Sequence, residues 1–327
     1  MRIAVTGSIA TDHLMVFPGR FADQLLPDQL AHVSLSFLVD GLEVRFGGVA
    51  ANIAFGLGGF GLSPLLVGAV GTDFAEYEVW LKEHGVDTGG VRVSGERQTA
   101  RFMCITDEDA NQIAAFYAGA MSEACDIDLG AVLAGAERPG LVLISPDDPS
   151  AMLRHTAECR DLGIPFAADP SQQLARLDGD QVRALVDGAT WLFTNEYEAA
   201  LLMEHTGWSR DEVLAAVGTW ITTLGAGGVR MERAGLSPLT VPAVPGIDPA
   251  DPTGGGDAFR AGFLAAVSHG VALEPAARLG CALASVALGA VGSQAHEVDP
   301  AQLAAIVERA YGPDAAAPLA PVLGEPS

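Results

Sequence analysis

Short, continuously apolar runs alternate with helix-length patterns along this chain, and no other feature limits its fold as strongly. The runs that we expect to be strands are 3–5, 65–67, 141–144, 165–168, 191–193 and 220–223. The helices expected between them are 49–58, 74–84, 149–161, 180–187, 196–205 and 209–216. Continuous apolar character is typical of parallel strands that are covered on both faces. The pattern therefore predicts one open, mostly parallel sheet in a single α/β domain over residues 1–327.

Two segments interrupt this rhythm, at about residues 13–46 and 97–117, and both resemble strands with mixed faces. The first contains an expected strand at 33–39. The second has the pattern of a hairpin, with strands at 100–105 and 112–116 on either side of a polar turn. Strands inserted outside an α/β core are suited to form a lid over a binding site, or a surface through which a homodimer pairs. The alternative interpretation is an extra edge on the main sheet.

The charge of the chain excludes several kinds of partner. The formal net charge is −23, and Lys82 is the only lysine. A chain this acidic repels the phosphate backbone and anionic lipid, so we expect neither nucleic-acid binding nor membrane binding. A Gly-Lys-Ser/Thr phosphate loop cannot be written with this sequence. Any bound phosphate must therefore be held by backbone N–H groups, metal ions and arginines.

The cysteines and the N-terminal residues lead us to expect a cytoplasmic protein. The four cysteines are Cys104, Cys125, Cys159 and Cys281. None has metal-binding spacing, and we interpret them as reduced residues of a reducing compartment. Residues 1–7 read as a strand and a turn rather than a signal peptide. The Ala/Pro-rich end, 313–327, reads as a weakly ordered tail.

The strongest chemical signal is a run of three glycines, Gly254, Gly255 and Gly256, followed by Asp257 and a helical pattern. Glycine lets a backbone approach an anion closely, and the first N–H groups of a helix carry a partial positive charge. A carboxylate in that first turn lies beside any bound anion and can take a proton from an attacking hydroxyl. The alternative is an ordinary glycine-rich loop.

Two motifs near the N-terminus support the functional interpretation. Gly47 and Gly48 open a second helical pattern, and Asn52 follows one turn later, where its amide can donate and accept hydrogen bonds. Asp12 follows the first strand in a turn that begins at Gly7. Polar groups that leave strand ends converge at the mouth of an open α/β sheet. Without the other motifs, Asp12 would be read as a turn residue.

These motifs, in this order, resemble the PfkB (ribokinase) family of carbohydrate kinases over almost the whole chain. The matching motifs are Gly47–Asn52, Gly68–Asp73, Asp169-Pro170, Asn195–Glu198, Thr223–Gly228 and Gly254–Asp257. The stretches 7–15, 116–124 and 169–177 are similar to the actinobacterial adenosine kinases of that family. The resemblance implies a ribokinase-like three-layer α/β/α sandwich with a small β-strand lid. It also implies an ATP-dependent kinase that phosphorylates the 5′-hydroxyl of adenosine in purine salvage.

The resemblance assigns roles by matching position. Asp257 would be the base for the 5′-hydroxyl, and the N–H groups of the three preceding glycines would stabilise the transferred phosphoryl group. The residues implied to hold the ribose hydroxyls are Asp12, Gly48 and Asn52. The residues implied to line the ATP site are Asn195, Thr223, Gly225 and Gly228.

The resemblance also implies metal sites. Glu198 would bind Mg²⁺ through water, because Mg²⁺ keeps much of its hydration shell. A monovalent cation, K⁺, is implied near Asp251 and the carbonyl groups around Ala287 and Gly292. The family's usual Asp-Thr-x-Gly-Ala-Gly-Asp is replaced here by a run that contains Pro252 and Gly255. Proline removes one N–H from that loop.

A nucleoside needs a flat apolar slot for its base, which a free sugar does not. Phe102 and Phe116 face each other across the expected hairpin and are suited to stack on a purine. Gln172 and Gln173 follow a strand end and can read an adenine edge, as amides do in DNA recognition. Two serines, Ser8 and Ser36, are further candidate substrate contacts. The alternative is that the phenylalanines belong to the core and the glutamines to the surface.

Three other functions compete with this hypothesis. A ribokinase or another sugar or nucleoside kinase of the same family would share the fold. A nucleoside-binding regulator without catalysis is a different class, and the presence of Asp257, Asn195 and Glu198 argues against it. A dinucleotide-dependent dehydrogenase is disfavoured because the first turn lacks Gly-x-Gly-x-x-Gly.

Overall fold

The main sheet of the computed structural model has nine strands, in the order β13-β12-β11-β10-β9-β8-β1-β4-β5. The structure describes residues 1–24, 34–250 and 253–324. The strands of this sheet are β1 (Ile3–Thr6), β4 (Leu65–Val70), β5 (Asp87–Val93), β8 (Leu141–Ile144), β9 (Phe166–Ala168), β10 (Trp191–Asn195), β11 (Thr219–Thr223), β12 (Val229–Glu232) and β13 (Leu239–Val241). From β11 across to β5 in this spatial order, neighbouring strands pair in parallel, and β12 and β13 add an antiparallel edge. The predicted parallel sheet is confirmed.

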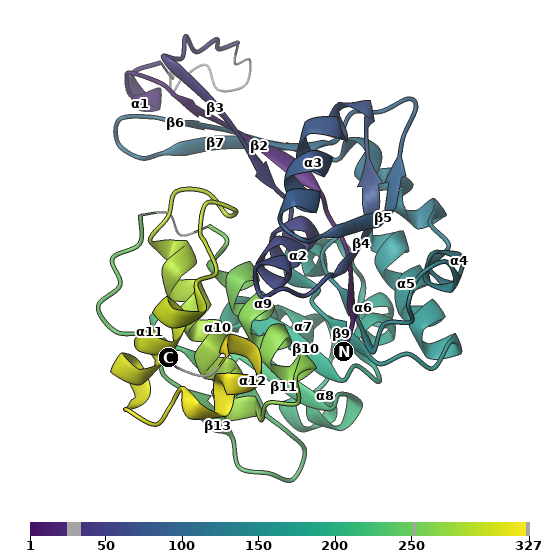
Figure 1. Ribbon diagram of the computed structural model, residues 1–327. Coiled ribbons are helices and arrows are strands. Elements are labelled where there is room, and N and C mark those ends of the chain that lie inside the picture. Colours follow the sequence, from purple (N-terminus) through teal and green to yellow (C-terminus); the bar gives the residue numbers. More distant parts are fainter. Residues whose placement is uncertain (25–33, 251–252, 325–327) are drawn as a thin grey trace.

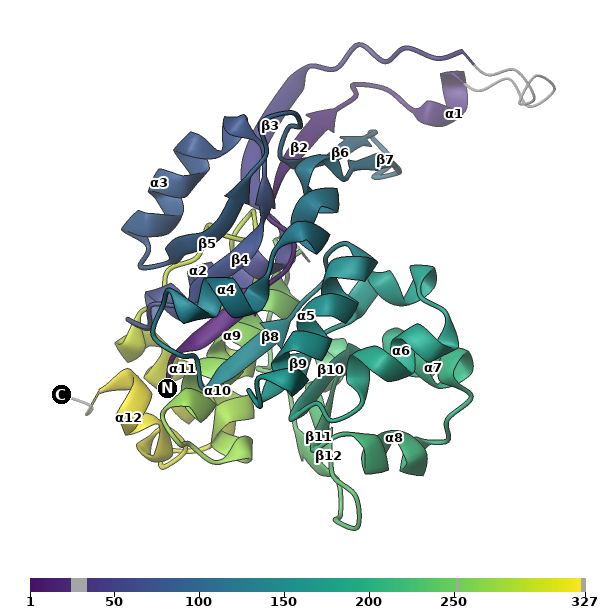
Figure 2. The ribbon, with the colours of Figure 1, turned by 90° about the vertical axis from the view of Figure 1, so that its right-hand side faces the viewer.

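Helices cover both faces of this sheet, as Figures 1 and 2 show. The helices are α1 (Phe21–Gln24), α2 (Val49–Gly59), α3 (Ala75–Glu83), α4 (Leu129–Ala134), α5 (Pro149–Asp161), α6 (Gly179–Val186), α7 (Glu196–Thr206), α8 (Arg210–Ala216), α9 (Gly255–Ser268), α10 (Leu273–Leu288), α11 (Pro300–Tyr311) and α12 (Ala320–Leu323). Successive strand residues enter different hydrophobic clusters: Val5 and Leu66 pack with α2, α3, α9 and α10, whereas Ala4 and Leu65 pack with α4 to α8. The fold is therefore the expected three-layer sandwich.

Short 3₁₀ turns connect these elements at several places. They are η2 (Thr72–Phe74), η3 (Gly119–Asp126), η4 (Ser171–Arg176), η5 (Gly225–Gly227) and η6 (Ala317–Leu319). Two of them, η4 and η5, directly follow strand ends of the main sheet, after β9 and β11. They replace long loops at the edge where the carboxyl ends of the parallel strands lie, and so fix the polar residues there.

The two interrupting segments form a separate four-stranded sheet, in the order β3-β2-β6-β7, which projects from the main body in Figure 1. Its strands are β2 (Ala10–Val16), β3 (Gly41–Gly47), β6 (Ala100–Thr106) and β7 (Gln112–Tyr117). The hairpin is found as predicted, since β6 and β7 pair antiparallel from Arg101 with Tyr117 to Thr106 with Gln112. The alternative of an extra edge on the main sheet is not what the pairing shows.

The strand predicted at 33–39 is wrong over its described part, because residues 34–39 have no strand. The strand lies later, at β3, which pairs with β2 through all seven of its residues. Phe37 instead packs edge-on against Phe17 and Phe21, with ring centroids 5.0 Å apart in both pairs. An aromatic cluster therefore holds this segment, and its apolar residues do not reflect a strand ladder.

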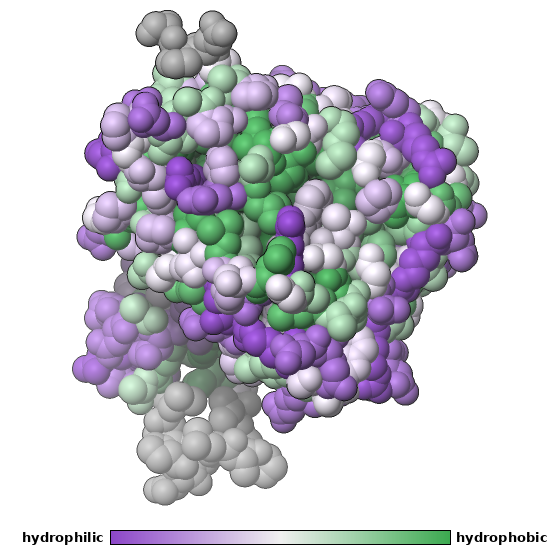
Figure 3. All heavy atoms as spheres, turned by 90° about the horizontal axis from the view of Figure 1, so that it is seen from below, coloured by the Kyte–Doolittle hydropathy of each residue, from purple (hydrophilic) through white to green (hydrophobic). Residues whose placement is uncertain are grey.

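The expectation of a weakly ordered tail is also wrong as far as Gly324. Residues 317–323 form η6 and α12, and Leu319 is fully buried. The face of the molecule remote from the small sheet has hydrophilic residues along its edges and apolar residues between them (Figure 3). Among the described residues, no helix combines the length and apolar character that crossing a membrane requires.

Candidate active site

Three parallel strands deliver polar side chains to one edge of the main sheet. Asp169 follows β9, Asn195 ends β10 and Thr223 ends β11, and these strands pair in register. Asn195 also caps α7: its Oδ1 accepts from the N–H of Glu198 at 2.8 Å, and Glu198 Oε2 accepts from the N–H of Asn195 at 2.7 Å. This reciprocal capping box fixes both side chains at the start of the helix.

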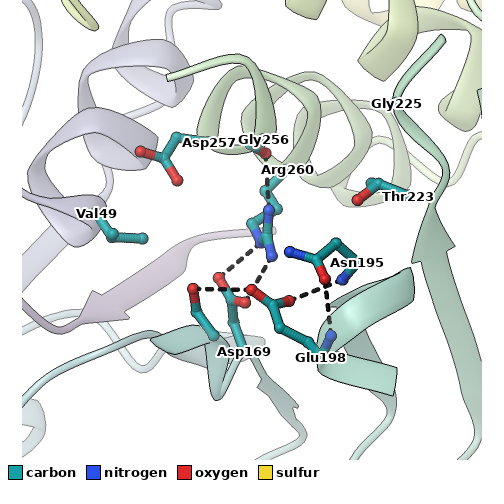
Figure 4. Close-up of a pocket in the computed structure, with 10 residues that line it drawn as sticks. Val49, Asp169, Asn195, Glu198, Thr223, Gly225, Gly256, Asp257 and Arg260 are labelled. Carbon is teal, nitrogen blue, oxygen red and sulfur yellow. Dashed lines mark hydrogen bonds and ion pairs between the residues drawn. The ribbon is translucent and has the colours of Figure 1, made fainter. Parts of the chain in front are cut away.

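A cavity of about 340 Å³ opens at this edge. The predicted residues that line it are Asn195, Glu198, Thr223, Gly225, Gly256 and Asp257. Figure 4 shows α9 entering from above, with Gly256 and Asp257 in its first turn, while Asn195 and Glu198 lie below. The structure thus brings together residues from three of the predicted motifs.

The same cavity contains a buried ion pair that the sequence analysis missed. Arg260 Nε lies 2.6 Å from Asp169 Oδ2, and Arg260 Nη2 donates to Asp169 Oδ1 at 2.6 Å. Arg260 Nη1 donates to the carbonyl oxygen of Gly256 at 3.0 Å (Figure 4). Burial raises the pKa of Asp169, and the guanidinium opposes this effect. An arginine three residues after Asp257, in an otherwise apolar helix, was the signal that could have revealed it.

A second cavity, of about 560 Å³, lies between the small sheet and the main body. The predicted residues that line it are Ser8, Asp12, Gly48, Asn52, Phe102, Phe116, Gln172, Gln173, Gly254 and Asp257. Asp12 and Phe102 come from β2 and β6 of the small sheet, where they are paired directly. The remaining residues come from strand ends and helix starts of the main body, except Phe116, which is on β7.

One wall of this cavity combines aromatic rings and amides. Phe102 and Phe116 are paired in the β6–β7 ladder, so their side chains lie on the same face. Phe116 is 52% exposed, which leaves its ring free to receive a planar group. Gln173 also lines the cavity. It is buried, and within the described residues its Oε1 has no hydrogen-bond partner. A buried acceptor without a partner is costly unless a ligand satisfies it.

The turn around Gly48 shows why this motif needs glycine. Gly48 has a φ of +95°, and a Cβ there would lie 2.6 Å from both Ala10 N and Ser8 O. The strand end of β1 therefore packs directly on the start of α2. Ser8 Oγ accepts from the N–H of Val49 at 3.0 Å, so it caps α2 as well as lining the cavity.

Asp257 lies where the two cavities meet, since it lines both of them. Asn52 Nδ2 donates to Asp257 Oδ2 at 2.9 Å. Burial raises the pKa of the Asp257 carboxyl, whereas the charge of Arg260 and the hydrogen bond from Asn52 lower it. The first N–H groups of α9 have no partner within the helix, so those at Gly255 and Gly256 are available to an anion.

Three predicted residues are not among those that line these cavities. Ser36 is exposed and lines neither of them. Gly228 and Gly255 also line neither; a Cβ on Gly228 would meet Val241 O, and one on Gly255 would meet the Leu288 side chain. A further predicted residue, Asp251, lies outside the described residues.

The residues around Glu198 fit a metal that keeps its water. Within the part of the chain that the structure describes, no group of three or more His, Cys, Asp or Glu side chains is arranged to hold a metal ion. Mg²⁺ needs only one or two carboxylates together with substrate phosphates and water. Glu198 offers such a carboxylate to the smaller cavity, already oriented by Asn195.

This geometry suits the transfer of a group between two ligands. A hydroxyl bound in the larger cavity can give its proton to Asp257 and attack an anion bound in the smaller cavity. The N–H groups in the first turn of α9 can stabilise the charge that such an anion develops. A carboxylate, a helix start and a facing hydroxyl site are the parts that phosphoryl transfer needs.

Comparison with known proteins identifies the family. The model of the family described as "pfkB family carbohydrate kinase" matches residues 8–299. The nucleoside kinase of Burkholderia thailandensis in complex with inosine superimposes with a TM-score of 0.83 and 34% identity, covering 94% of this chain and 98% of that one. The nucleoside kinase of Methanocaldococcus jannaschii has a TM-score of 0.84 and 25% identity, with 94% and 98% covered.

A curated ribokinase is similar to a comparable degree. The Bacillus subtilis enzyme is 29% identical over 251 residues, which are 76% of this chain and 83% of that protein. A kinase of this family uses ATP as phosphate donor, generally with Mg²⁺. The chain belongs to the pfkB family of carbohydrate kinases.

Proposed function

We propose that the protein is an adenosine kinase, which transfers the γ-phosphoryl group of ATP to the 5′-hydroxyl of adenosine and gives AMP and ADP in purine salvage. One observation carries this proposal: Asp257 is the carboxylate that lines both the larger and the smaller cavity. A base in that place reaches an acceptor hydroxyl on one side and a phosphoryl group on the other. No separate proton relay is needed.

In this proposal Asp257 takes the 5′-hydroxyl proton as the oxygen attacks the γ-phosphorus. The bond from that phosphorus to the bridging oxygen breaks, and ADP leaves. The N–H groups of Gly254, Gly255 and Gly256 stabilise the negative charge on the transferred group. Asp12, Gly48 and Asn52 hold the ribose, and this agrees with their place in the larger cavity.

The phosphates of ATP occupy the smaller cavity in this proposal. Asn195, Thr223 and Gly225 line it, and Glu198 would hold Mg²⁺ through water, where the ion neutralises phosphate charge. Gly228 shapes the turn that carries Gly225. A K⁺ ion near Asp251 remains part of the proposal, although that residue lies outside the described ones.

The preference for adenosine is proposed from the aromatic rings and side-chain amides that line the larger cavity. Phe102 and Phe116 provide the stacking surface for a purine, a contact worth about 1–3 kcal/mol per stacked base in proteins that bind single-stranded nucleic acids. Gln172 and Gln173 are placed to read the base edge, and the unpartnered Oε1 of Gln173 is suited to accept from the adenine amino group. Ribose alone would leave these rings and amides without a contact to the ligand.

We further propose that the small sheet acts as a lid, with its strands in the segments 13–46 and 97–117, and as the contact of a homodimer. It supplies Asp12, Phe102 and Phe116 to the larger cavity, so its approach would exclude water from the reaction. Its exposed apolar residues suit pairing with a second copy. They include Val16, Leu42, Val44 and Ile113.

A substrate panel tests the function. Adenosine, inosine, guanosine and ribose are compared as acceptors with ATP and Mg²⁺, with and without K⁺. We expect the highest kcat/KM for adenosine, and ribose turnover equal to or above that of adenosine would overturn the proposal. Inosine is the informative competitor because it is the ligand in the B. thailandensis structure.

Variants of the glutamines sharpen this test. Gln173→Leu removes the proposed reader of the amino group, so we expect the adenosine-to-inosine ratio of kcat/KM to fall by about 10-fold. Gln181→Leu, which disturbs a capping box on α6 outside both cavities, is the matched control and should leave that ratio unchanged. An unchanged ratio in Gln173→Leu would remove the residue from its proposed role.

A further inference from the structure

A buried hydrogen-bond network leads away from Asp257 into the protein. Asn52 joins it to the carboxylate through Nδ2, at 2.9 Å. On its other side, Asn52 Oδ1 accepts from Ser293 Oγ at 3.0 Å and from Gln294 Nε2 at 2.9 Å. Asn52, Ser293 and Gln294 are each at least nine-tenths buried, so these bonds are shielded from water.

The direction of the Asn52 amide decides what Asp257 faces. A side-chain amide presents a donor and an acceptor of nearly the same shape, and only its partners determine which way it lies. If Asn52 turned over, its oxygen would point at the carboxylate. Asp257 would then lose a charge-assisted hydrogen bond and gain a repulsive neighbour.

One end of the network can only donate. The indole Nε1–H of Trp80, on α3, lies 3.0 Å from Gln294 Oε1 and donates to it. Because an indole N–H cannot accept, the oxygen of Gln294 must lie toward Trp80. Its amino group must then lie on the opposite side, toward Asn52. Trp80 thus fixes the direction of two amides in series.

At the other end of the network, the Tyr77 oxygen can only accept a hydrogen bond from Gln294. The reason is that the Tyr77 hydroxyl already donates its proton to the carbonyl oxygen of Gly47, at 2.9 Å. Burial raises the pKa of Tyr77 well above its usual range, so the hydroxyl keeps its proton. Its oxygen is therefore left to accept from Gln294 Nε2, a bond that the structure also contains. Both ends agree on one direction for every group between them.

We propose that Trp80 and Gln294 are positioning residues, which hold the Asn52 amide so that its N–H₂ group faces Asp257. The inference rests on the proposed role of Asp257 as the base. Neither residue lines the larger or the smaller cavity, so neither touches a substrate there. They come from α3 and from the loop after α10, far apart in sequence, and meet behind α2.

The proposal has a consequence for the pH dependence of the reaction. Arg260 and Asn52 are the groups that oppose the effect of burial on the pKa of Asp257. The other charged residues on the cavity walls are Asp12, Arg176, Asp169 and Glu198. Loss of the Asn52 donor removes one opposing effect and leaves the rest in place. The pKa of Asp257 rises, and the acidic limb of kcat/KM moves to higher pH.

Two variants test the proposal. Gln294→Glu has nearly the same shape but replaces the amino donor with an acceptor, which favours the turned-over Asn52. We expect kcat to fall about 10- to 100-fold, the effect of losing one hydrogen bond to a charged group, with little change in the KM for ATP. Trp80→Phe removes the indole N–H and leaves a smaller aromatic ring, so it should shift kcat and the acidic limb in the same direction by less.

Trp220→Phe is the matched control, because Trp220 Nε1 donates to Thr194 Oγ1 at 2.9 Å in the core, away from Asp257. It removes the same kind of bond and should leave the pH profile unchanged. Because Trp80 and Gln294 act in series, the double variant should have the same kcat as Gln294→Glu alone. Additive losses of kcat in the double variant would overturn the proposal. Equal pH profiles for Trp80→Phe and Trp220→Phe would also overturn it, and this second comparison can be made even if Gln294→Glu fails to fold.

A third variant separates this proposal from the function on which it rests. Asp257→Asn must lose nearly all turnover if Asp257 is the base. If it retains turnover, the proposed function is wrong. If it loses turnover while Trp80→Phe behaves like the control, only the positioning role is wrong.

Discussion

The two cavities differ in how far the protein has completed them by itself. In the smaller one, two charged groups already have partners within the protein: Arg260 forms an ion pair with Asp169, and Glu198 accepts from the backbone N–H of Asn195. In the larger one, Phe116 is exposed and Gln173 holds a buried oxygen without a partner among the described residues. The comparison teaches that the proposed phosphate side has its charged groups held in place by the protein, whereas the proposed acceptor side leaves groups for a ligand to contact.

The residue common to both cavities should give the largest effect. Asp257→Asn keeps the shape but cannot take a proton, so we expect kcat to fall roughly 10²- to 10⁴-fold, the usual contribution of a general base. Nucleoside binding, measured by calorimetry, should be retained. Retained turnover would show that the junction between the cavities is not where the reaction occurs.

Breaking the prebuilt ion pair should cost stability even without ligand. Arg260→Met leaves the carboxylate of Asp169 buried without its counter-charge, and we expect a loss of about 3–5 kcal/mol in urea unfolding. The comparison variant is Arg210→Met, which removes one of the two arginines paired with the buried carboxylate of Glu232. It should cost less, because Arg230 still neutralises that carboxylate and Arg210 is 35% exposed. Equal losses would mean that the burial of the Arg260–Asp169 pair does not determine how much its removal destabilises the protein.

In the larger cavity we expect the opposite result, with a large effect on substrate binding and a small one on stability. Phe116→Ala removes an exposed ring, so the free energy of unfolding should hardly change. The KM for adenosine should rise by about 5- to 100-fold, the range expected from the loss of one stacked base, while the KM for ATP stays the same. A matching rise in the KM for ATP would contradict the assignment of separate ligands to the two cavities.

The smallest expected effect is on the free energy of unfolding, which the carboxylate of Asp257 lowers at neutral pH. Because the folded protein raises the pKa of Asp257, the native state binds this proton more tightly than the unfolded chain does. Its contribution to stability is therefore present at low pH and is lost as the pH rises through the folded pKa. Asp257→Asn should be the more stable protein at neutral pH, by on the order of 1 kcal/mol. The difference should shrink on acidification in thermal unfolding, and a constant difference would contradict it.

The main sheet could be predicted from the sequence because its strands are uniformly apolar. Leu141–Ile144 is buried at every residue, and such runs leave little choice of structure. The same logic placed Asp169, Asn195 and Thr223 at one edge, since parallel strands end together. The hairpin from Ala100 to Tyr117 followed from a polar turn between two apolar runs.

The errors arose where apolar residues serve purposes other than a strand or a core helix. In residues 34–39, Phe37 packs in an aromatic cluster, and in residues 313–324, Leu319 is buried in the core. Neither kind of packing produces a periodic pattern in the sequence. The partners of Asn52 were missed for a related reason: Gln294 lies 242 residues away, and long-range pairing of polar groups leaves no local pattern.

Val49 and Asp257 are the two residues that line both cavities. In the proposed function each cavity holds one ligand, so a substitution at Phe116 or at Thr223 would change the recognition of that ligand alone. A substitution at Val49 would change the recognition of both ligands at once. Under this proposal the recognition of acceptor and donor can evolve independently over most of the site, but a change at Val49 must suit two molecules together.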